Sequence, residues 1–293
     1  MGDRMASKAK SLLQDICSMA FAMAWMATGA AAADLQVLHA DSLAGPMREL
    51  KRAFEAKTPG TTLTLKSGVS RELAERIVKG EACDVFAPSA PAVIDQDLIG
   101  RKITGTDIDA ATWYVVFSAN EMAIITAKGN PLGIRQVSDL ARPDVKFARV
   151  TGDKDLATGR TIEFVKRATA QEGKPELAQK IIDAAPADPA KPTSVPGTVQ
   201  AVKDGSANAG VVYYSAAVAA RNDVDILRYA DNVNLSDTIR NAATVPGASR
   251  NATEAAAFVA FLLTPEAQNI LKDTGQPPVV PAIRKGAVPA SVN

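Results

Sequence analysis

The chain has 293 residues, of which 47% are hydrophobic, 22% charged and 5% aromatic. This composition is that of a folded protein and excludes disordered and collagen-like chains, while the length predicts one large or two medium domains. The 33 basic residues nearly balance the 32 acidic ones. That balance argues against a nucleic-acid partner, which requires a basic surface.

Residues 1–33 predict an export signal. Basic residues begin the segment, an apolar run follows at 16–28, and small side chains fill 29–33, which is the order of a cleaved secretory signal. The alternative is a membrane anchor, but the apolar run is shorter than the roughly 20 residues that span a bilayer. We therefore expect cleavage near residues 32–33 and a periplasmic protein. Cys83 is then the one thiol of the mature chain, and we expect it to be buried and inert.

Strand and helix patterns alternate beyond residue 33. In the first part of the chain, strands are predicted at 35–39, 61–65 and 84–87, with helices at 46–55 and 70–79. In the second part, strands are predicted at 122–127, 147–150 and 209–213, with helices at 161–170 and 198–203. Two further helices are predicted at 252–263 and 265–272. This alternation predicts an α/β fold of mainly parallel sheets flanked by helices.

Three of the predicted strand-to-helix turns carry small or hydroxyl-bearing residues directly before a helix. They contain Ser42, then Ser67 with Ser70, and then Thr158. Ligands of open parallel sheets bind beyond the carboxyl ends of the strands, and the first N–H groups of a helix attract anions. Helix capping is the ordinary explanation of any one turn. The occurrence of three such turns indicates an anion site that needs no formal positive charge.

Few other residues offer chemistry. Tyr213 ends an apolar strand, where it either packs in the core or projects its hydroxyl into a cleft. His39 is the only histidine and lies in a predicted strand, so a packed core histidine is a simpler interpretation than a catalytic one. Asp153 and Asp155 lack the further acidic ligands of an EF-hand loop. The sequence contains no GxSxG, HExxH, Walker A or GxGxxG motif. We expect no enzyme, although a hydrolase that uses His39 or a carboxylate pair stays open.

Several segments together resemble the periplasmic solute-binding proteins of ABC importers, in their molybdate- and tungstate-binding branch. The more diagnostic ones are LHADSLAGPMRELKRAFEAKTPG (38–60) and WYVVFSANEMAIITAKGNP (113–131). The others are LAERIVKGEACDVFAPSA (73–90), GVVYYSAAV (210–218) and AAAFVAFLLTPEAQNILKDTG (255–275). The resemblance implies a type II, two-lobed fold with the ligand in the interlobe cleft. Lobe one would comprise 34–117 and 241–293, and lobe two 118–240, with hinges near 117–121 and 234–241.

The resemblance also implies the ligand and how it is held. The family binds a tetrahedral oxyanion through hydroxyl and backbone N–H groups, needs no cofactor, delivers to a membrane permease and works as a monomer. Matched position by position, the binding residues in this sequence are Ser42, Ser70, Thr158, Val195 and Tyr213.

The sequence departs from the family pattern at several positions, which makes Asp155 and Asp41 secondary candidates. Asp155 matches one of two carboxylates that complete an octahedral arrangement in one branch, but Val212 replaces the other. We therefore expect a four-coordinate anion. Asp41 stands beside the first serine, where a small residue is typical, and a carboxylate facing the cleft would repel an anion. Pro196 has no N–H, so Gly197 or Thr198 is an alternative donor to Val195.

The sequence thus predicts an exported protein that captures molybdate or tungstate. A binding protein for sulfate, phosphate or a small organic acid is the first alternative. An exported hydrolase is the second.

Overall fold

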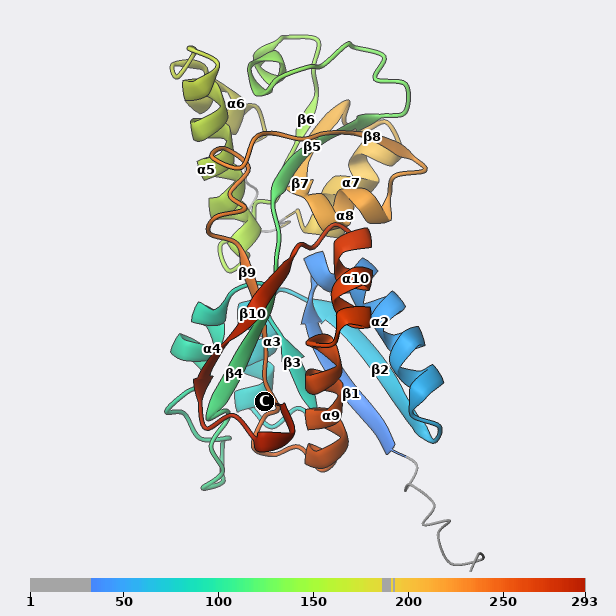
Figure 1. Ribbon diagram of the computed structural model, residues 1–293. Helices are drawn as coiled ribbons and strands as arrows, with labels where there is room; N and C mark the ends of the chain where they lie inside the picture. The colour runs from blue at the N-terminus through green and yellow to red at the C-terminus, as the bar shows by residue number, and fades with distance from the viewer. Residues whose placement is uncertain (1–32, 186–190, 192, 293) are drawn as a thin grey trace, which may run out of the picture. The chain divides into compact units, whose positions relative to one another are not determined.

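The computed structural model describes residues 33–185, 191 and 193–292 (Figure 1). The predicted export signal lies outside the described residues except for Ala33, where strand β1 begins. Within the described ranges, no helix combines the length and the apolar character needed to cross a membrane.

The first sheet is parallel. Strand β1 (Ala33–Ala40) lies between β2 (Thr61–Gly68) and β3 (Val85–Ala87) and pairs in parallel with both. Both faces of β1 are buried over residues 37–40, where Val37 enters one apolar cluster and Leu38 enters another. The connections contain the 3-10 helix η1 (Asp41–Leu43), α2 (Ala44–Lys57), α3 (Ser70–Val78) and, after β3, α4 (Pro91–Asp97).

The register of this sheet places three strand ends together. Ala40 of β1 is paired with Gly68 of β2, and the neighbouring His39 is paired with Ala87 of β3. The turns that lead into η1, α3 and α4 therefore leave the sheet at a common edge.

A second sheet contains β4 (Trp113–Ala119) between β9 (Arg240–Ala243) and β10 (Pro278–Gly286), with both neighbours antiparallel to it. A bridge between Phe86 and Thr244 joins this sheet to β3. Helices α9 (Ala252–Leu262) and α10 (Pro265–Asp273) and the 3-10 helix η3 (Ala290–Val292) complete this part of the chain.

The third sheet has the order β6 (Phe147–Ala148), β7 (Ala209–Tyr213), β5 (Met122–Ala127) and β8 (Val224–Leu227). Helices α5 (Leu156–Gln171) and α6 (Leu177–Ala184) lie on one side of it, and α7 (Val195–Lys203) and α8 (Tyr214–Ala219) on the other (Figure 1). The 3-10 helix η2 (Val137–Ala141) packs beside α6. Successive side chains of β5 pack on opposite faces of the sheet, since Ile124 and Ile125 belong to different apolar clusters.

The α/β class predicted from the sequence is confirmed, but the expectation of mainly parallel sheets is right only for the sheet around β1. Strand β5 is antiparallel to both β7 and β8, and the only parallel pair of its sheet is β6 with β7. The second sheet is antiparallel because β4 leads from the first part of the chain toward the third sheet and β9 leads back from it. These two neighbouring strands therefore run in opposite directions.

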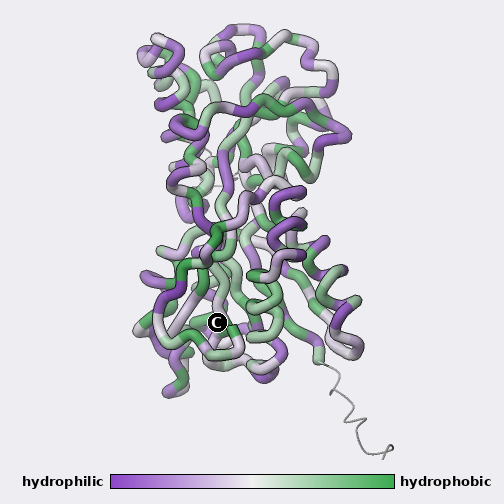
Figure 2. Tube along the Cα trace, in the orientation of Figure 1, coloured by the Kyte–Doolittle hydropathy of each residue, from purple (hydrophilic) through white to green (hydrophobic). Residues whose placement is uncertain are grey.

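The buried side chains fall into two sets, which we use to name two lobes. The clusters of lobe one draw their buried members from 33–117 and 242–292, and those of lobe two from 122–239. Along the chain, hydrophobic stretches follow the strands, while hydrophilic ones lie on the outer helices and loops (Figure 2).

Candidate functional site

A small cavity lies at the carboxyl edge of the parallel sheet, between residues of the two lobes. Its lining from lobe one is Ala40, Asp41, Ser42, Gly68, Val69, Ser70 and Ser89, and its lining from lobe two is Asp155, Val195 and Tyr213. Every site residue predicted from the sequence is among them except Thr158. The volume is about 10 Å³, which is roughly the room that one water molecule needs.

Ser42 contributes a buried hydroxyl. It lies in η1, directly after β1, and is 2% exposed. Its Oγ has no hydrogen-bond partner, whereas its carbonyl oxygen accepts from Ser215 Oγ at 2.6 Å and from Gln276 Nε2 at 3.3 Å. A buried hydroxyl without a partner costs free energy. The Ser42 hydroxyl is therefore available to a guest in the cavity.

Ser70 and Ser89 form a second hydroxyl group. Ser70 is the first residue of α3, whose N-cap is Val69, so a capping role for Ser70 is wrong. Its Oγ instead accepts from the N–H of Ser89 at 3.2 Å and lies 3.4 Å from Ser89 Oγ. Ser89 was missed from the sequence, although the motif SAP between β3 and α4 has the same small, hydroxyl-bearing character as the three turns that were identified.

Tyr213 ends β7 and is 2% exposed. Its hydroxyl oxygen accepts from Arg160 Nη1 at 2.6 Å, while Arg160 Nη2 donates to the carbonyl oxygen of Ser89 at 2.9 Å. Burial raises the pKa of Tyr213, so the phenol keeps its proton and can donate it to an anion. Arg160 was missed from the sequence, and it joins the two lobes beside the cavity.

Two carboxylates also reach the cavity. Asp155 caps α5 by accepting from the N–H of Ala157 at 2.9 Å. Burial raises the pKa of Asp155, and the negative charge of Asp41 raises it further against the opposing Ala157 contact. Burial also raises the pKa of Asp41, with Glu72 adding to the rise and a hydrogen bond with Ser67 opposing it. Among the described residues, no group of three or more His, Cys, Asp or Glu side chains is placed to hold a metal ion.

The start of α7 offers one backbone donor. Val195 lines the cavity and is the first residue of the helix. The N–H of Gly197 donates to Ser194 Oγ and that of Thr198 to Ser194 O, while Pro196 has no N–H. Among the first four residues of α7, only Val195 can therefore offer its N–H to a guest.

Thr158 is the predicted residue that the structure does not bring to the cavity. Its N–H donates to the carbonyl oxygen of Asp155 at 3.0 Å, and its hydroxyl donates to the carbonyl oxygen of Gly152 at 2.7 Å. Both donors thus hold the turn before α5, and these contacts do not support the predicted role of Thr158.

Comparison with known proteins fits this arrangement. The family model of bacterial extracellular solute-binding proteins matches residues 35–276. The chain belongs to this family. The curated molybdate-binding protein ModA of Mycobacterium bovis is 26% identical over 246 residues, which cover 83% of this chain and 84% of the relative.

Solved structures of this kind have the same fold as this solute-binding protein. The periplasmic molybdate-binding protein of Azotobacter vinelandii superimposes with a TM-score of 0.63 at 17% identity, covering 84% of this chain and 99% of the other. The sulfate-binding protein SubI of Mycobacterium tuberculosis gives a TM-score of 0.63 at 17% identity, covering 85% of this chain and 88% of the other. These likenesses confirm the type II fold that the sequence predicted.

The histidine on which one form of the hydrolase alternative depends is packed in the core of the solute-binding protein. His39 is 2% exposed, and its Nδ1 lies 2.9 Å from the carbonyl oxygen of Ala40. Burial lowers the pKa of His39, so the ring is neutral near neutral pH. Cys83 is also buried, and burial raises the pKa of its thiol. The packed histidine and the buried cysteine expected from the sequence are confirmed.

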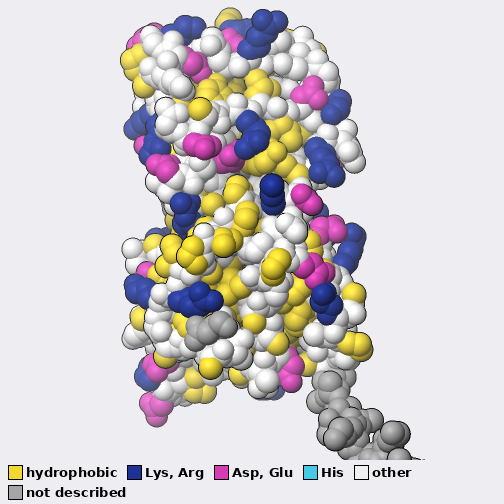
Figure 3. All heavy atoms as spheres, viewed as in Figure 1, with side chains coloured by type: hydrophobic (Ala, Val, Ile, Leu, Met, Phe, Trp, Pro, Cys, Tyr) yellow, Lys and Arg dark blue, Asp and Glu magenta, His cyan; other side chains and the backbone are white. Residues whose placement is uncertain are grey.

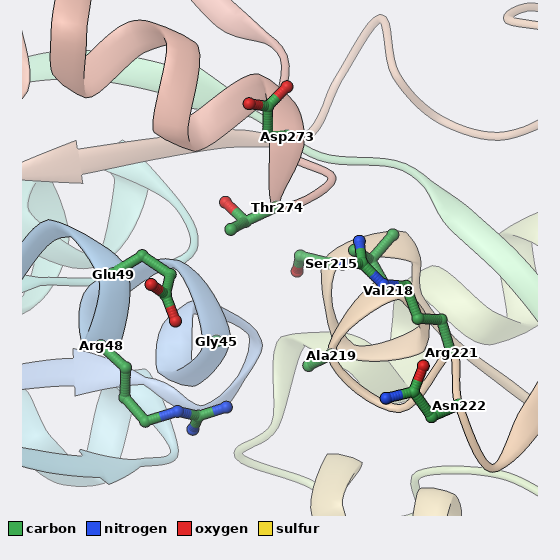
Figure 4. A pocket seen from close by; sticks show the side chains of 10 residues that line it. All are labelled: Gly45, Arg48, Glu49, Ser215, Val218, Ala219, Arg221, Asn222, Asp273 and Thr274. Atoms are coloured by element: carbon green, nitrogen blue, oxygen red, sulfur yellow. The ribbon is translucent and has the colours of Figure 1, made fainter.

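A larger groove of the solute-binding protein, about 620 Å³ in volume, lies among α2, α8 and the end of α10 (Figure 4). Its charged lining residues are Arg48, Glu49, Arg221 and Asp273. They carry both signs, and all but the half-buried Glu49 are exposed. Acidic and basic side chains are also interspersed over the face of the molecule in Figure 3. The groove therefore has no buried set of converging donors, unlike the cavity beside Ser42.

Proposed function

We propose that this solute-binding protein captures a tetrahedral oxyanion, molybdate or tungstate, in the cavity beside Ser42. The observation that carries the proposal is the Ser42 hydroxyl, which is buried, without a partner and part of the cavity lining. A satisfied core serine would have a partner within the protein.

The other groups around the cavity support an anion as the guest. Ser70 Oγ, Tyr213 OH and the Val195 N–H are further donors that line it. A hydrogen bond to a charged group contributes about 1.5–3 kcal/mol, so four donors give about 6–12 kcal/mol. This range contains the roughly 8 kcal/mol that corresponds to a micromolar dissociation constant.

A tetrahedral oxyanion is larger than a water molecule, and the described cavity has room for about one water molecule. The lobes must therefore separate before the anion enters. We propose that the crossings at 117–121 and 234–241 act as the hinge. Arg160 with Ser89 and Lys154 with Glu75 are contacts between the lobes that would break on opening and form again on closure. The described arrangement then corresponds to the closed form.

The relatives support the choice of ligand. Both the curated relative from Mycobacterium bovis and the solved protein from Azotobacter vinelandii bind molybdate by name, and SubI binds another tetrahedral oxyanion. We further propose that the chain is exported to the periplasm by the signal at 1–33, acts without a cofactor as a monomer, and delivers its anion to an ABC permease.

A panel of anions tests this function. The purified protein would be melted in the presence of molybdate, tungstate, sulfate, phosphate and citrate, and the anions that raise Tm would be titrated by calorimetry. A ligand at 100 times its Kd stabilises the folded state by about 2.7 kcal/mol, so we expect clear shifts with molybdate and tungstate. If none of the oxyanions raises Tm, the result would contradict the proposal and favour the hydrolase alternative.

A further inference from the structure

We propose that oxyanion binding by this protein takes up a proton, which is held between the guest and the carboxylates of Asp41 and Asp155. The inference rests on the proposed function and concerns the same cavity. In this proposal, Asp41 and Asp155 set the pH dependence of oxyanion affinity and the net charge of the complex.

The geometry brings the two carboxylates to one guest. Asp41 lies in η1 next to Ser42, and Asp155 lies at the start of α5 in the other lobe, yet both line the same cavity. Ser42 and Tyr213 line this cavity too, so an anion that contacts both of them also lies beside the two carboxyl groups. Each group is partly buried, and Asp155 is also held in place by the N–H of Ala157.

The charges around the pair do not balance an added dianion. The charged or titratable groups on the surrounding elements are His39 of β1, Arg48 of α2, Glu72 of α3, Arg160 of α5, Lys203 of α7 and Tyr213 of β7. His39 and Tyr213 are uncharged near neutral pH, and Glu72 is acidic and exposed. Arg48 and Lys203 line a neighbouring pocket with Asp41 rather than the cavity. Among the described lysine and arginine side chains, only the Arg160 guanidinium is hydrogen-bonded to cavity-lining residues, namely Tyr213 and Ser89.

A proton resolves this imbalance. Burial already raises the pKa of both Asp41 and Asp155, and a negative guest within a few ångströms raises the pKa of a carboxyl group further. The bound state therefore holds more protons than the free state. By linkage, affinity must fall as pH rises above the pKa of the free pair, by up to tenfold per pH unit for one proton. Below that pKa the free protein already carries the proton, so the affinity becomes constant.

The proton comes from the solvent, and no bond to a heavy atom forms or breaks. Once bound, it lies between a carboxylate oxygen and an oxygen of the guest, where it turns a repulsive contact into a charge-assisted hydrogen bond. The carboxyl group then acts as one more donor to the anion.

Calorimetric titration of the wild-type protein with molybdate tests the inference. Measurements between about pH 6 and about pH 8.5, each in two buffers that differ in ionisation enthalpy, give the number of protons taken up per anion. We expect a value near one over the upper part of this range, with affinity falling as pH rises. Tight molybdate binding with the same affinity at every pH and the same heat in both buffers would overturn the inference and leave the proposed function intact.

Variants assign the proton to the pair. In the double variant Asp41→Asn with Asp155→Asn, the carboxyl groups are replaced by amides of the same size, and asparagine also caps a helix well. We expect the pH slope to disappear and the affinity at about pH 8 to exceed that of the wild type. The matched control Asp153→Asn removes an exposed carboxylate from the same loop, outside the cavity lining, and should keep the wild-type slope.

The outcomes separate the two proposals. If the double variant has no cooperative melt, the single variants and the wild-type buffer comparison decide the question. A double variant that folds and keeps the full pH slope would overturn the role of the pair. If the wild-type protein binds no oxyanion at any pH, the proposed function fails and this inference fails with it.

Discussion

The cavity lined by Ser42 has a volume of about 10 Å³, and the groove beside α2 has about 620 Å³. In the cavity, buried hydroxyls from the ends of β1, β3 and β7 and from the start of α3 meet, and one of them has no partner. In the groove, mostly exposed side chains of opposite charge face solvent (Figure 4). An unsatisfied buried donor, rather than volume, therefore marks the site for an anion.

The cavity and the groove differ in how strongly water competes for an anion. A solvated arginine binds an anion only weakly, because water screens the charge and the side chain loses entropy when it is held. A buried hydroxyl is already fixed and already desolvated. A hydrogen bond to the bound anion therefore offsets the desolvation free energy that the unpartnered hydroxyl cost on folding. Substitutions in the cavity should therefore change anion affinity much more than substitutions in the groove. The following variants test this in order of decreasing effect.

Arg160→Ala should have the largest effect. The change removes both charge-assisted hydrogen bonds that join Tyr213 and Ser89 across the lobes, together with a cation beside the cavity. We expect molybdate affinity to fall by about 3 kcal/mol, or more than 100-fold. Arg160→Lys should recover only part of the loss, because an ammonium group cannot make both contacts in the same fork geometry. Calorimetry that shows wild-type affinity for the alanine variant would remove Arg160 from the site.

Ser42→Ala should have the next largest effect. The change removes one donor to the anion and should weaken binding by about 1–3 kcal/mol. The melting temperature of the protein without ligand should stay constant or rise, because the hydroxyl that is removed is buried and has no partner. A fall in Tm with unchanged affinity would show that Ser42 is a structural residue instead.

Asp155→Asn should change the stability of the unliganded protein in a pH-dependent way. The pKa of Asp155 is raised above its ordinary value, mainly by burial. A carboxyl group of this kind favours the folded state at low pH and loses that contribution as pH rises through its folded pKa. The variant should therefore melt above the wild type at neutral pH, and the difference should shrink as pH falls toward about 4. A difference that grows on acidification would contradict the assigned direction.

Substitutions in the groove should have the smallest effect. Arg221→Ala and Asp273→Asn change exposed residues that line the groove and do not line the cavity. Surface changes of this kind alter free energies by less than about 0.5 kcal/mol, so molybdate affinity should change by less than about twofold. A tenfold loss in either variant would move the site from the cavity to the groove.

Much of the fold could be predicted because its signals are local. The apolar run of β1 and the amphipathic pattern of α3 were placed to within two residues of their observed ends. Helix α5 was predicted to begin at residue 161 but begins at Leu156, because Ala157 and Gly159 give its first turns no apolar pattern. Strand β10 was missed, since it contains two prolines and is mostly exposed. Its pairing with β4 is a tertiary property that a sequence pattern does not record.

The site divides in the same way. Ser42, Ser70 and Tyr213 could be found because each follows or ends a strand, and the common edge of the sheet brings such positions together. Arg160 could not, because a charged residue near the start of a helix is ordinarily solvated. Its partner Tyr213 is distant in the sequence, so the contact exists only in the folded chain. Ser89 lay within reach of the same reasoning that found Ser42.

A crystal structure of the protein grown with tungstate is the most direct test of the account. The anomalous signal of tungsten locates the anion without assumptions about its contacts. We expect one tungsten atom between Ser42, Ser70 and Tyr213, with oxygens of the tungstate within hydrogen-bonding distance of Asp41 and Asp155. A tungsten atom in the groove between Arg48 and Arg221, or bound only at exposed side chains, would contradict it.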